Sequence, residues 1–178
     1  MVRSSISSQD TIQGSGLSRL TFEKVVRRAL EVIRADREIT VNIKLATDAM
    51  LNAAKEAGLL FADAAQEDFV WGNIKARQRM IAQHAIAGTL RGLVIGTDHS
   101  AEALMGFFTK FGDGAADILP LSGLNKRRVR AVANAMGAPE SLAMKVPTAD
   151  LESLIPLRPD EDAYGGHLRG DSASCSSV

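Results

Sequence analysis

The segment that decides the fold is LVIGTDHSAEALMGFFTKFGDGAAD, residues 93–117. It opens with a short apolar run at 93–95, which is typical of a buried strand, and turns at Gly96 into the polar cluster 97–99. A helix is expected next, followed by a glycine-broken loop with charged residues. Ligands in open α/β sheets bind beyond the carboxyl ends of strands, where a strand leads into a helix. The order of these elements therefore predicts a ligand site within this segment.

Upstream of this segment, the hydrophobic pattern predicts further helices and a strand. Apolar residues recur at helical spacing from Thr21 to Ile33, and apolar and polar residues alternate as in a strand over 39–43. Helices are predicted over 45–57, with a stop at Gly58, and from Asn73 to about Gly88.

Downstream, two more helices are expected. Gly137 and Pro139 mark the end of the second one, at about 125–136. Their apolar stripes, expected to be buried, are Ala101, Leu104, Met105 and Phe108 in the first and Val129, Val132, Ala133 and Met136 in the second.

Alternating strands and helices predict the α/β class. The pattern contains only two convincing strands, 39–43 and 93–95. A two-stranded parallel sheet is too small to be stable alone. We therefore expect the sheet of this chain to be incomplete.

The composition restricts the classes of function. Lys plus Arg (21) balance Asp plus Glu (21), and aromatic residues make up 4% of the 178 residues. These values argue against a nucleic-acid partner, and no apolar run reaches the ~20 residues of a membrane span. Cys175 cannot form an internal disulfide, because it is the only cysteine. A cytoplasmic, reducing location is expected.

Several charged side chains occupy positions that permit two interpretations. Arg77 lies on the apolar stripe between Ile74 and Ile81. It is either an internal salt-bridge partner or an arginine at the edge of the stripe, or else it contacts an anion. Its neighbours Lys75 and Arg79 are expected to be solvated.

The polar cluster and the glycine-broken loop are similarly open to two readings. Thr97 and Asp98 both suit a helix N-cap. His99 and Glu102 share a helical face, either as two metal ligands or as an ordinary histidine and a surface carboxylate. Lys110 and Asp117 belong either to a simple connection or to a ligand loop.

Lys126 opens the last expected helix together with Arg127 and Arg128. Cations are disfavoured at a helix N-terminus by the macrodipole. A bound phosphate would relieve this repulsion, whereas a solvated basic turn is the alternative.

The chain resembles the ammonia-dependent NAD synthetases from about Ala29 to Tyr164. The resemblance rests on several motifs in unbroken order: ITVNIK (39–44), GNIKARQRMIAQ (72–83), GTDHSAEA (96–103), GFFTKFGDGAADILPL (106–121), LNKRRVR (124–130) and KVPTADLE (145–152). The resemblance implies a Rossmann-like (adenine nucleotide alpha hydrolase-like) parallel sheet with flanking helices, and a homodimer. It also implies that ATP and Mg²⁺ are used to adenylate deamido-NAD, which ammonia then converts to NAD.

The resemblance also assigns roles to single residues. Deamido-NAD contacts fall on Arg77, Lys110 and Asp117. ATP contacts fall on Thr97, Lys126 and Thr148, and the magnesium ligand falls on Glu102. No role is implied for His99.

The chain departs from the family pattern at both ends. The family's Ser-Gly-Gly-x-Asp-Ser pyrophosphate loop has no counterpart string in the sequence, and neither has its C-terminal His-Lys pair. We expect a disordered leader at 1–18, a partial synthetase domain at 19–164 and a divergent, disordered tail at 165–178. DNA encoding Gly166–Asp171 can give a Val-Thr-Tyr segment when read one base later, which suggests a frameshift. A fragment with little activity of its own is expected, and a non-catalytic dimerisation or binding module is the alternative.

Overall fold

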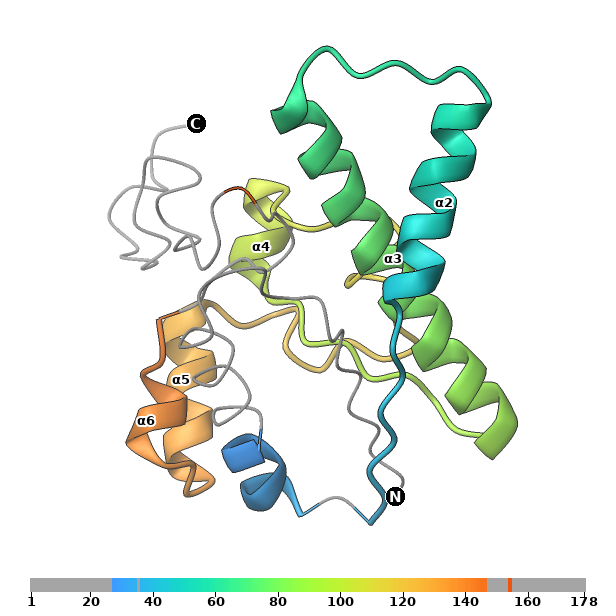
Figure 1. The fold of residues 1–178 in the computed structure, drawn as a ribbon. Coiled ribbons are helices and arrows are strands. Elements are labelled where there is room, and N and C mark those ends of the chain that lie inside the picture. Colours follow the sequence, from blue (N-terminus) through green and yellow to red (C-terminus); the bar gives the residue numbers. More distant parts are fainter. Residues whose placement is uncertain (1–26, 35, 147–153, 155–178) are drawn as a thin grey trace, which may run out of the picture.

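The computed structural model describes residues 27–34, 36–146 and 154. Residues 27–33 are helical, and the other helices of the described part are α2 (Lys44–Glu56), α3 (Ala64–Leu90), α4 (Ser100–Met105), α5 (Lys126–Ala135) and α6 (Glu140–Ala143). Helices α2 and α3 form an antiparallel hairpin, and in the view of Figure 1 α4 lies between this hairpin and the α5–α6 pair. The expected leader 1–18 and tail 165–178 lie outside the described residues.

The helix predicted over 45–57 is confirmed as α2. Thr47 and Leu51 are buried, and Ile43, which directly precedes the helix, is 3% exposed. The predicted stop is also confirmed, because Gly58 has a φ of +90°, a left-handed conformation that suits glycine.

Helix α3 is longer than predicted and begins at Ala64 rather than at Asn73. Its N-cap is Asp63, whose Oδ1 accepts from the main-chain N–H of Gln66 at 2.8 Å, while Gln66 Oε1 accepts from the N–H of Ala62 at 2.7 Å. A capping acid followed three residues later by glutamine is a signal for a helix start that the sequence prediction missed.

The strands predicted at 39–43 and 93–95 do not form in the described part of the chain. At 39–43 the expected alternation of burial is present, since Ile43 is buried while Thr40 and Asn42 are exposed. Among the residues that the structure describes, no segment pairs with it. Near 93–95 an isolated parallel bridge joins Ile95 to Ile118. A strand needs a hydrogen-bonded neighbour, and the local sequence pattern does not reveal whether one is present.

The two apolar stripes expected to be buried are largely exposed. Helix α4 ends at Gly106, which has a φ of +66°, so it is too short to include Phe108, and Leu104 is 73% exposed. On α5 the predicted range and the Gly137 stop are confirmed, but Val132 and Met136 are exposed. Helix α6, which packs on α5, is too short to cover the whole stripe.

No helix in the described residues combines the length and the hydropathy that a membrane span requires.

Candidate functional site

Two hydrogen bonds attach the glycine-broken loop to α3. Arg77 Nε donates to the main-chain oxygen of Lys110 at 3.1 Å, and Thr109 Oγ1 donates to Asn73 Oδ1 at 2.9 Å. Arg77 and Lys110, which are 33 residues apart in sequence, are thus adjacent in space. The loop is therefore more than a free connection, because it is bonded to the helix that carries Arg77.

Asp117 lies at the other end of this loop, beside the parallel bridge. Its Oδ2 accepts from the main-chain N–H of Val94 at 2.7 Å, and its own N–H donates to the carbonyl oxygen of Val94 at 2.9 Å. These bonds fix Asp117 to the apolar run that precedes Gly96. The structure thereby brings both ends of the segment 93–117 together.

An open cavity of about 320 Å³ lies between α4 and the loop. Its lining combines charged and polar groups with apolar ones: Asp98, His99, Ala103, Phe108, Lys110, Phe111, Gly114, Ala115, Leu119 and Ser122. A cavity of this size fits a ring-sized part of a small-molecule ligand.

His99, rather than Thr97 or Asp98, is the N-cap of α4. Its Nδ1 accepts from the N–H of Glu102 at 3.4 Å, and its own N–H donates to Glu102 Oε2 at 3.0 Å, which completes a capping box. His99 is 6% exposed. The expectation of a Thr97 or Asp98 cap is wrong because the chain stays extended through His99, which has a φ of −122°.

Asp98 lies in an acidic environment next to this cap. Burial raises the pKa of Asp98 above its usual value, and the charges of Asp113 and Glu102 raise it further, whereas His99 acts in the opposite direction. A Cβ on Gly114 would lie 2.9 Å from Asp98 Oδ2, so the missing side chain lets the loop approach this carboxylate closely. A cation bound here would be favoured by the surrounding negative charge.

Glu102, the expected magnesium ligand, takes part in the capping box and lies near His99, whose Nε2 is 3.5 Å from Glu102 Oε1. No group of three His, Cys, Asp or Glu side chains among the described residues is arranged to hold a metal ion. A carboxylate has acceptor sites for about four hydrogens or ions, so Glu102 retains capacity for one more contact.

Lys126 is buried, with 8% of its surface exposed, at the first position of α5. Asn125 caps this helix by accepting from the N–H of Arg128 at 3.0 Å. The burial of Lys126 excludes the solvated basic turn for this residue, although Arg127 and Arg128 are exposed as that interpretation requires. Thr148, the third expected ATP contact, lies outside the described residues, and Thr97 is exposed.

Lys75 was expected to be solvated, and this expectation is wrong. It is 2% exposed, and its Nζ lies 4.3 Å from the centre of the Trp71 ring, one helical turn away. The spacing of an aromatic residue and a lysine at i and i+4 could have indicated this contact. Asn73 was also missed, although it lies one turn before Arg77 on the same face of α3.

Solved structures identify the class of fold. NAD⁺ synthetase from Burkholderia pseudomallei matches with a TM-score of 0.67 and 55% identity, covering 89% of this chain and 54% of that protein. NMN synthetase from Francisella tularensis matches with a TM-score of 0.75 and 32% identity, covering 93% and 61%. The fold is therefore that of the NAD synthetases and related enzymes.

Curated sequences identify the family. The NH₃-dependent NAD⁺ synthetase of Burkholderia lata is 69% identical over 143 residues, which are 80% of this chain and 51% of that protein. The family model described as NAD synthase matches residues 11–167. The chain belongs to the NAD synthase family, and it spans about half the length of the curated relatives that it matches.

Proposed function

We propose that this chain carries the mid-region of an ammonia-dependent NAD synthetase and that its residues bind deamido-NAD and ATP for amide formation. The observation that carries the proposal is the contact between Arg77 and the loop of Lys110, found in a chain 69% identical to an NH₃-dependent NAD⁺ synthetase. Arg77 on α3 is bonded to the main chain of Lys110, which lines the cavity, so two cationic residues from distant parts of the sequence lie close to it. Positive charge beside a cavity suits an anionic dinucleotide.

The reaction consists of two substitutions. A carboxylate oxygen of deamido-NAD attacks the α-phosphorus of ATP, so that pyrophosphate leaves and a mixed anhydride with AMP forms. The nitrogen of ammonia then attacks the acyl carbon, AMP leaves with the bonding electron pair, and nitrogen loses a proton. The anhydride is needed because a free carboxylate is a poor electrophile, and cationic groups near the phosphates stabilise the charge that develops.

In this proposal the expected residues keep their roles. Arg77, Lys110 and Asp117 contact deamido-NAD, while Thr97, Lys126 and Thr148 contact ATP. The burial of Lys126 at the first position of α5 supports the second set, because the N-terminus of a helix favours a bound phosphate through its main-chain N–H groups and its dipole.

Glu102 fits a magnesium site of limited size. Mg²⁺ is usually held by one or two carboxylates together with water and substrate phosphates rather than by a complete protein cage. Glu102 would supply one ligand near the acidic group that also contains Asp98 and Asp113. When bound, the ion would neutralise phosphate charge.

The remaining expectations from the family belong to the same proposal. The parallel bridge between Ile95 and Ile118 supports a Rossmann-like parallel sheet that is incomplete in this chain. We propose a homodimer, a cytoplasmic location and a partial synthetase domain over 19–164. Exposed apolar side chains on α2 and α3 support the homodimer.

The test is an assay of the purified chain with ATP, Mg²⁺, ammonia and deamido-NAD, in which NAD and NMN are quantified separately. We expect little NAD from this polypeptide alone, because its sequence contains no Ser-Gly-Gly-x-Asp-Ser string to hold pyrophosphate. Robust turnover would contradict that expectation. Turnover that produces NMN instead would replace the proposed substrate by that of the Francisella tularensis relative.

A non-catalytic dimerisation or binding fragment of an NAD synthetase is the second candidate. The exposed apolar side chains of α2, such as Leu45 and Met50, favour it. Co-purification with an intact synthetase subunit, without turnover by the chain itself, would support this alternative.

A further inference from the structure

We propose that Thr109 is a positioning residue that holds the loop of Lys110 against α3, so that Lys110 and Arg77 present their charges to one anionic ligand. The proposal rests on the proposed function only in naming deamido-NAD as that ligand. It assigns the role to a residue that lies outside the cavity lining.

The polar groups of Thr109 are all bonded within the site. Its hydroxyl donates to Asn73 Oδ1 at 2.9 Å, its N–H donates to Asp113 Oδ1 at 2.9 Å, and its carbonyl accepts from the N–H of Gly112 at 2.8 Å. Thr109 is 5% exposed, so water does not readily replace these partners. One residue therefore ties the helix, the acidic end of the loop and the turn together.

The carbon atoms of Thr109 support the same turn. A Cβ on Gly112 would lie 2.9 Å from Thr109 Cβ and 3.0 Å from its Cγ2, so the turn packs directly onto the side chain. Within this turn, between Thr109 and Gly112, Phe111 has a φ of +60°, which is unfavourable for a residue other than glycine. Backbone in such a conformation persists only where its surroundings hold it.

The two attachments of the loop to α3 are one helical turn apart. Asn73 receives the Thr109 hydroxyl and Arg77 donates to the Lys110 carbonyl. A single bond would leave the loop free to rotate about it, whereas two bonds fix its orientation. The main chain of Lys110, which lines the cavity, is consequently held next to the Arg77 guanidinium.

The experiment compares Thr109→Val, which removes the hydroxyl but keeps the shape, with Thr109→Ser, which keeps the hydroxyl. Thr89→Val is the matched control, since the Thr89 hydroxyl donates to the carbonyl of Ala85 on the same helix, away from the loop. Two properties of the full chain are measured: solvent exchange of the Arg77 Nε–H by NMR without ligand, and the Kd for deamido-NAD by calorimetry.

We expect Thr109→Val to accelerate exchange of the Arg77 Nε–H and to raise the Kd by about tenfold, which corresponds to about 1.4 kcal/mol. Thr89→Val should stay close to wild type in both measurements. Thr109→Ser, which keeps the hydroxyl but loses the Cγ2 packed on the turn, should lie nearer to wild type than Thr109→Val does. If Thr109→Val fails to fold, Asn73→Ala removes the same hydrogen bond from the helix side and should have the same two effects.

Unchanged exchange in Thr109→Val would overturn the proposal, whatever the ligand result. Faster exchange with an unchanged Kd would also overturn it, because the loop would then be held without consequence for binding. Faster exchange in a chain whose wild type does not bind deamido-NAD would support the attachment by Thr109 and reject the proposed function.

Discussion

Gly96 directly follows the apolar run 93–95, and it has no room for a side chain. A Cβ there would lie 2.5 Å from Leu119 Cδ2 and 2.8 Å from Ala116 Cβ. Its N–H donates to the carbonyl of Ile118 at 2.9 Å, so the close approach is part of the parallel bridge. Glycine is required at this position by packing rather than by its backbone angles.

Gly96→Ala is therefore expected to lower the free energy of unfolding by about 1–3 kcal/mol, the usual effect of overpacking. Urea denaturation monitored by circular dichroism measures the change. Gly92→Ala is the control, because the nearest atom to its new Cβ would be the Ala87 oxygen at 3.9 Å. Equal stability of the two variants would contradict this account of Gly96.

His99 acts as the N-cap of α4, and its replacement by alanine should cost about 1 kcal/mol of stability. Asparagine is among the best capping residues, so His99→Asn should retain most of the wild-type stability. The free energies of unfolding of the two variants can be compared by urea denaturation. If His99→Ala and His99→Asn lower the free energy of unfolding equally, His99 does not stabilise α4 through its capping role.

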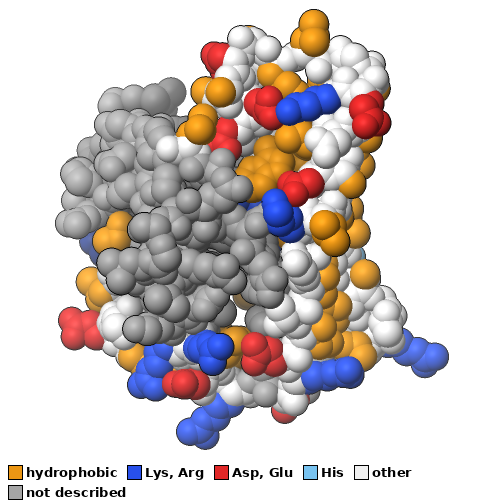
Figure 2. All heavy atoms as spheres, viewed as in Figure 1, with side chains coloured by type: hydrophobic (Ala, Val, Ile, Leu, Met, Phe, Trp, Pro, Cys, Tyr) orange, Lys and Arg blue, Asp and Glu red, His pale blue; other side chains and the backbone are white. Residues whose placement is uncertain are grey.

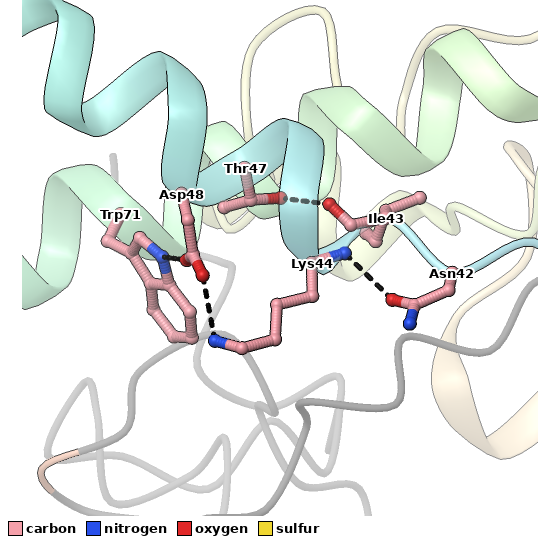
Figure 3. Close-up of polar contacts among 6 residues, drawn as sticks. All are labelled: Asn42, Ile43, Lys44, Thr47, Asp48 and Trp71. Atoms are coloured by element: carbon pink, nitrogen blue, oxygen red, sulfur yellow. Dashed lines mark hydrogen bonds and ion pairs between the residues drawn. The ribbon is translucent and has the colours of Figure 1, made fainter.

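At the scale of elements, the α2–α3 hairpin is joined by a polar group around Asp48. Lys44 Nζ donates to Asp48 Oδ2 at 2.8 Å, and Trp71 Nε1 donates to Asp48 Oδ1 at 3.1 Å (Figure 3). Burial alone would raise the pKa of Asp48, but these two hydrogen bonds outweigh it and hold the pKa below the usual 3.8. The carboxylate thus links the two helices in its ionised form.

A lowered pKa in the folded state adds stability above the unfolded pKa, and this contribution is lost as the pH falls through the folded pKa. Asp48→Asn should therefore destabilise the protein near neutral pH, and the difference from wild type should shrink with acidification below the usual pKa of 3.8. Urea denaturation of both proteins across this pH range checks the prediction. A difference that is independent of pH would contradict it.

The helices could be predicted because their signals are local. The apolar spacing and Gly58 indicated α2, and Gly137 indicated the end of α5. The sequence prediction missed the start of α3, although Asp63 followed by Gln66 is a usable signal for it. It also missed the His99 cap. Histidine is not among the usual N-cap residues, so its identity gave no signal for this cap.

The strands and the burial of single side chains depend on distant partners. Residues 39–43 alternate as a strand does, yet pairing requires a neighbour that a local pattern does not contain. Lys75 is predicted to be solvated because it points away from the apolar stripe that carries Arg77, whereas packing on Trp71 buries it. The adjacency of Arg77 and Lys110 likewise follows from tertiary structure and not from spacing.

At the scale of the whole molecule, hydrophobic side chains run along the α2–α3 hairpin (Figure 2). The large exposed ones include Leu45 at 79%, Met50 at 52%, Phe69 at 57% and Ile81 at 52%. Extended exposed apolar surface marks interaction sites, and the proposed homodimer would cover it.

Met50→Glu and Ile81→Glu should shift the chain from dimer toward monomer, because a buried charge without a partner is unfavourable at an interface. Analytical ultracentrifugation measures the distribution. Leu104→Glu, at a residue 73% exposed on α4, is the control and should leave it unchanged. A wild-type chain that sediments as a monomer at all concentrations would contradict the homodimer.

Arg77 and the loop 106–117 are proposed to form one recognition site for deamido-NAD. The most direct test is an NMR titration of the isotope-labelled chain with deamido-NAD, following the Arg77 Nε–H and the amides of Lys110 and Asp117. These three signals are expected to shift together along one saturable curve. Saturating ligand that leaves all three unmoved, or that shifts only signals remote from this loop, would contradict it.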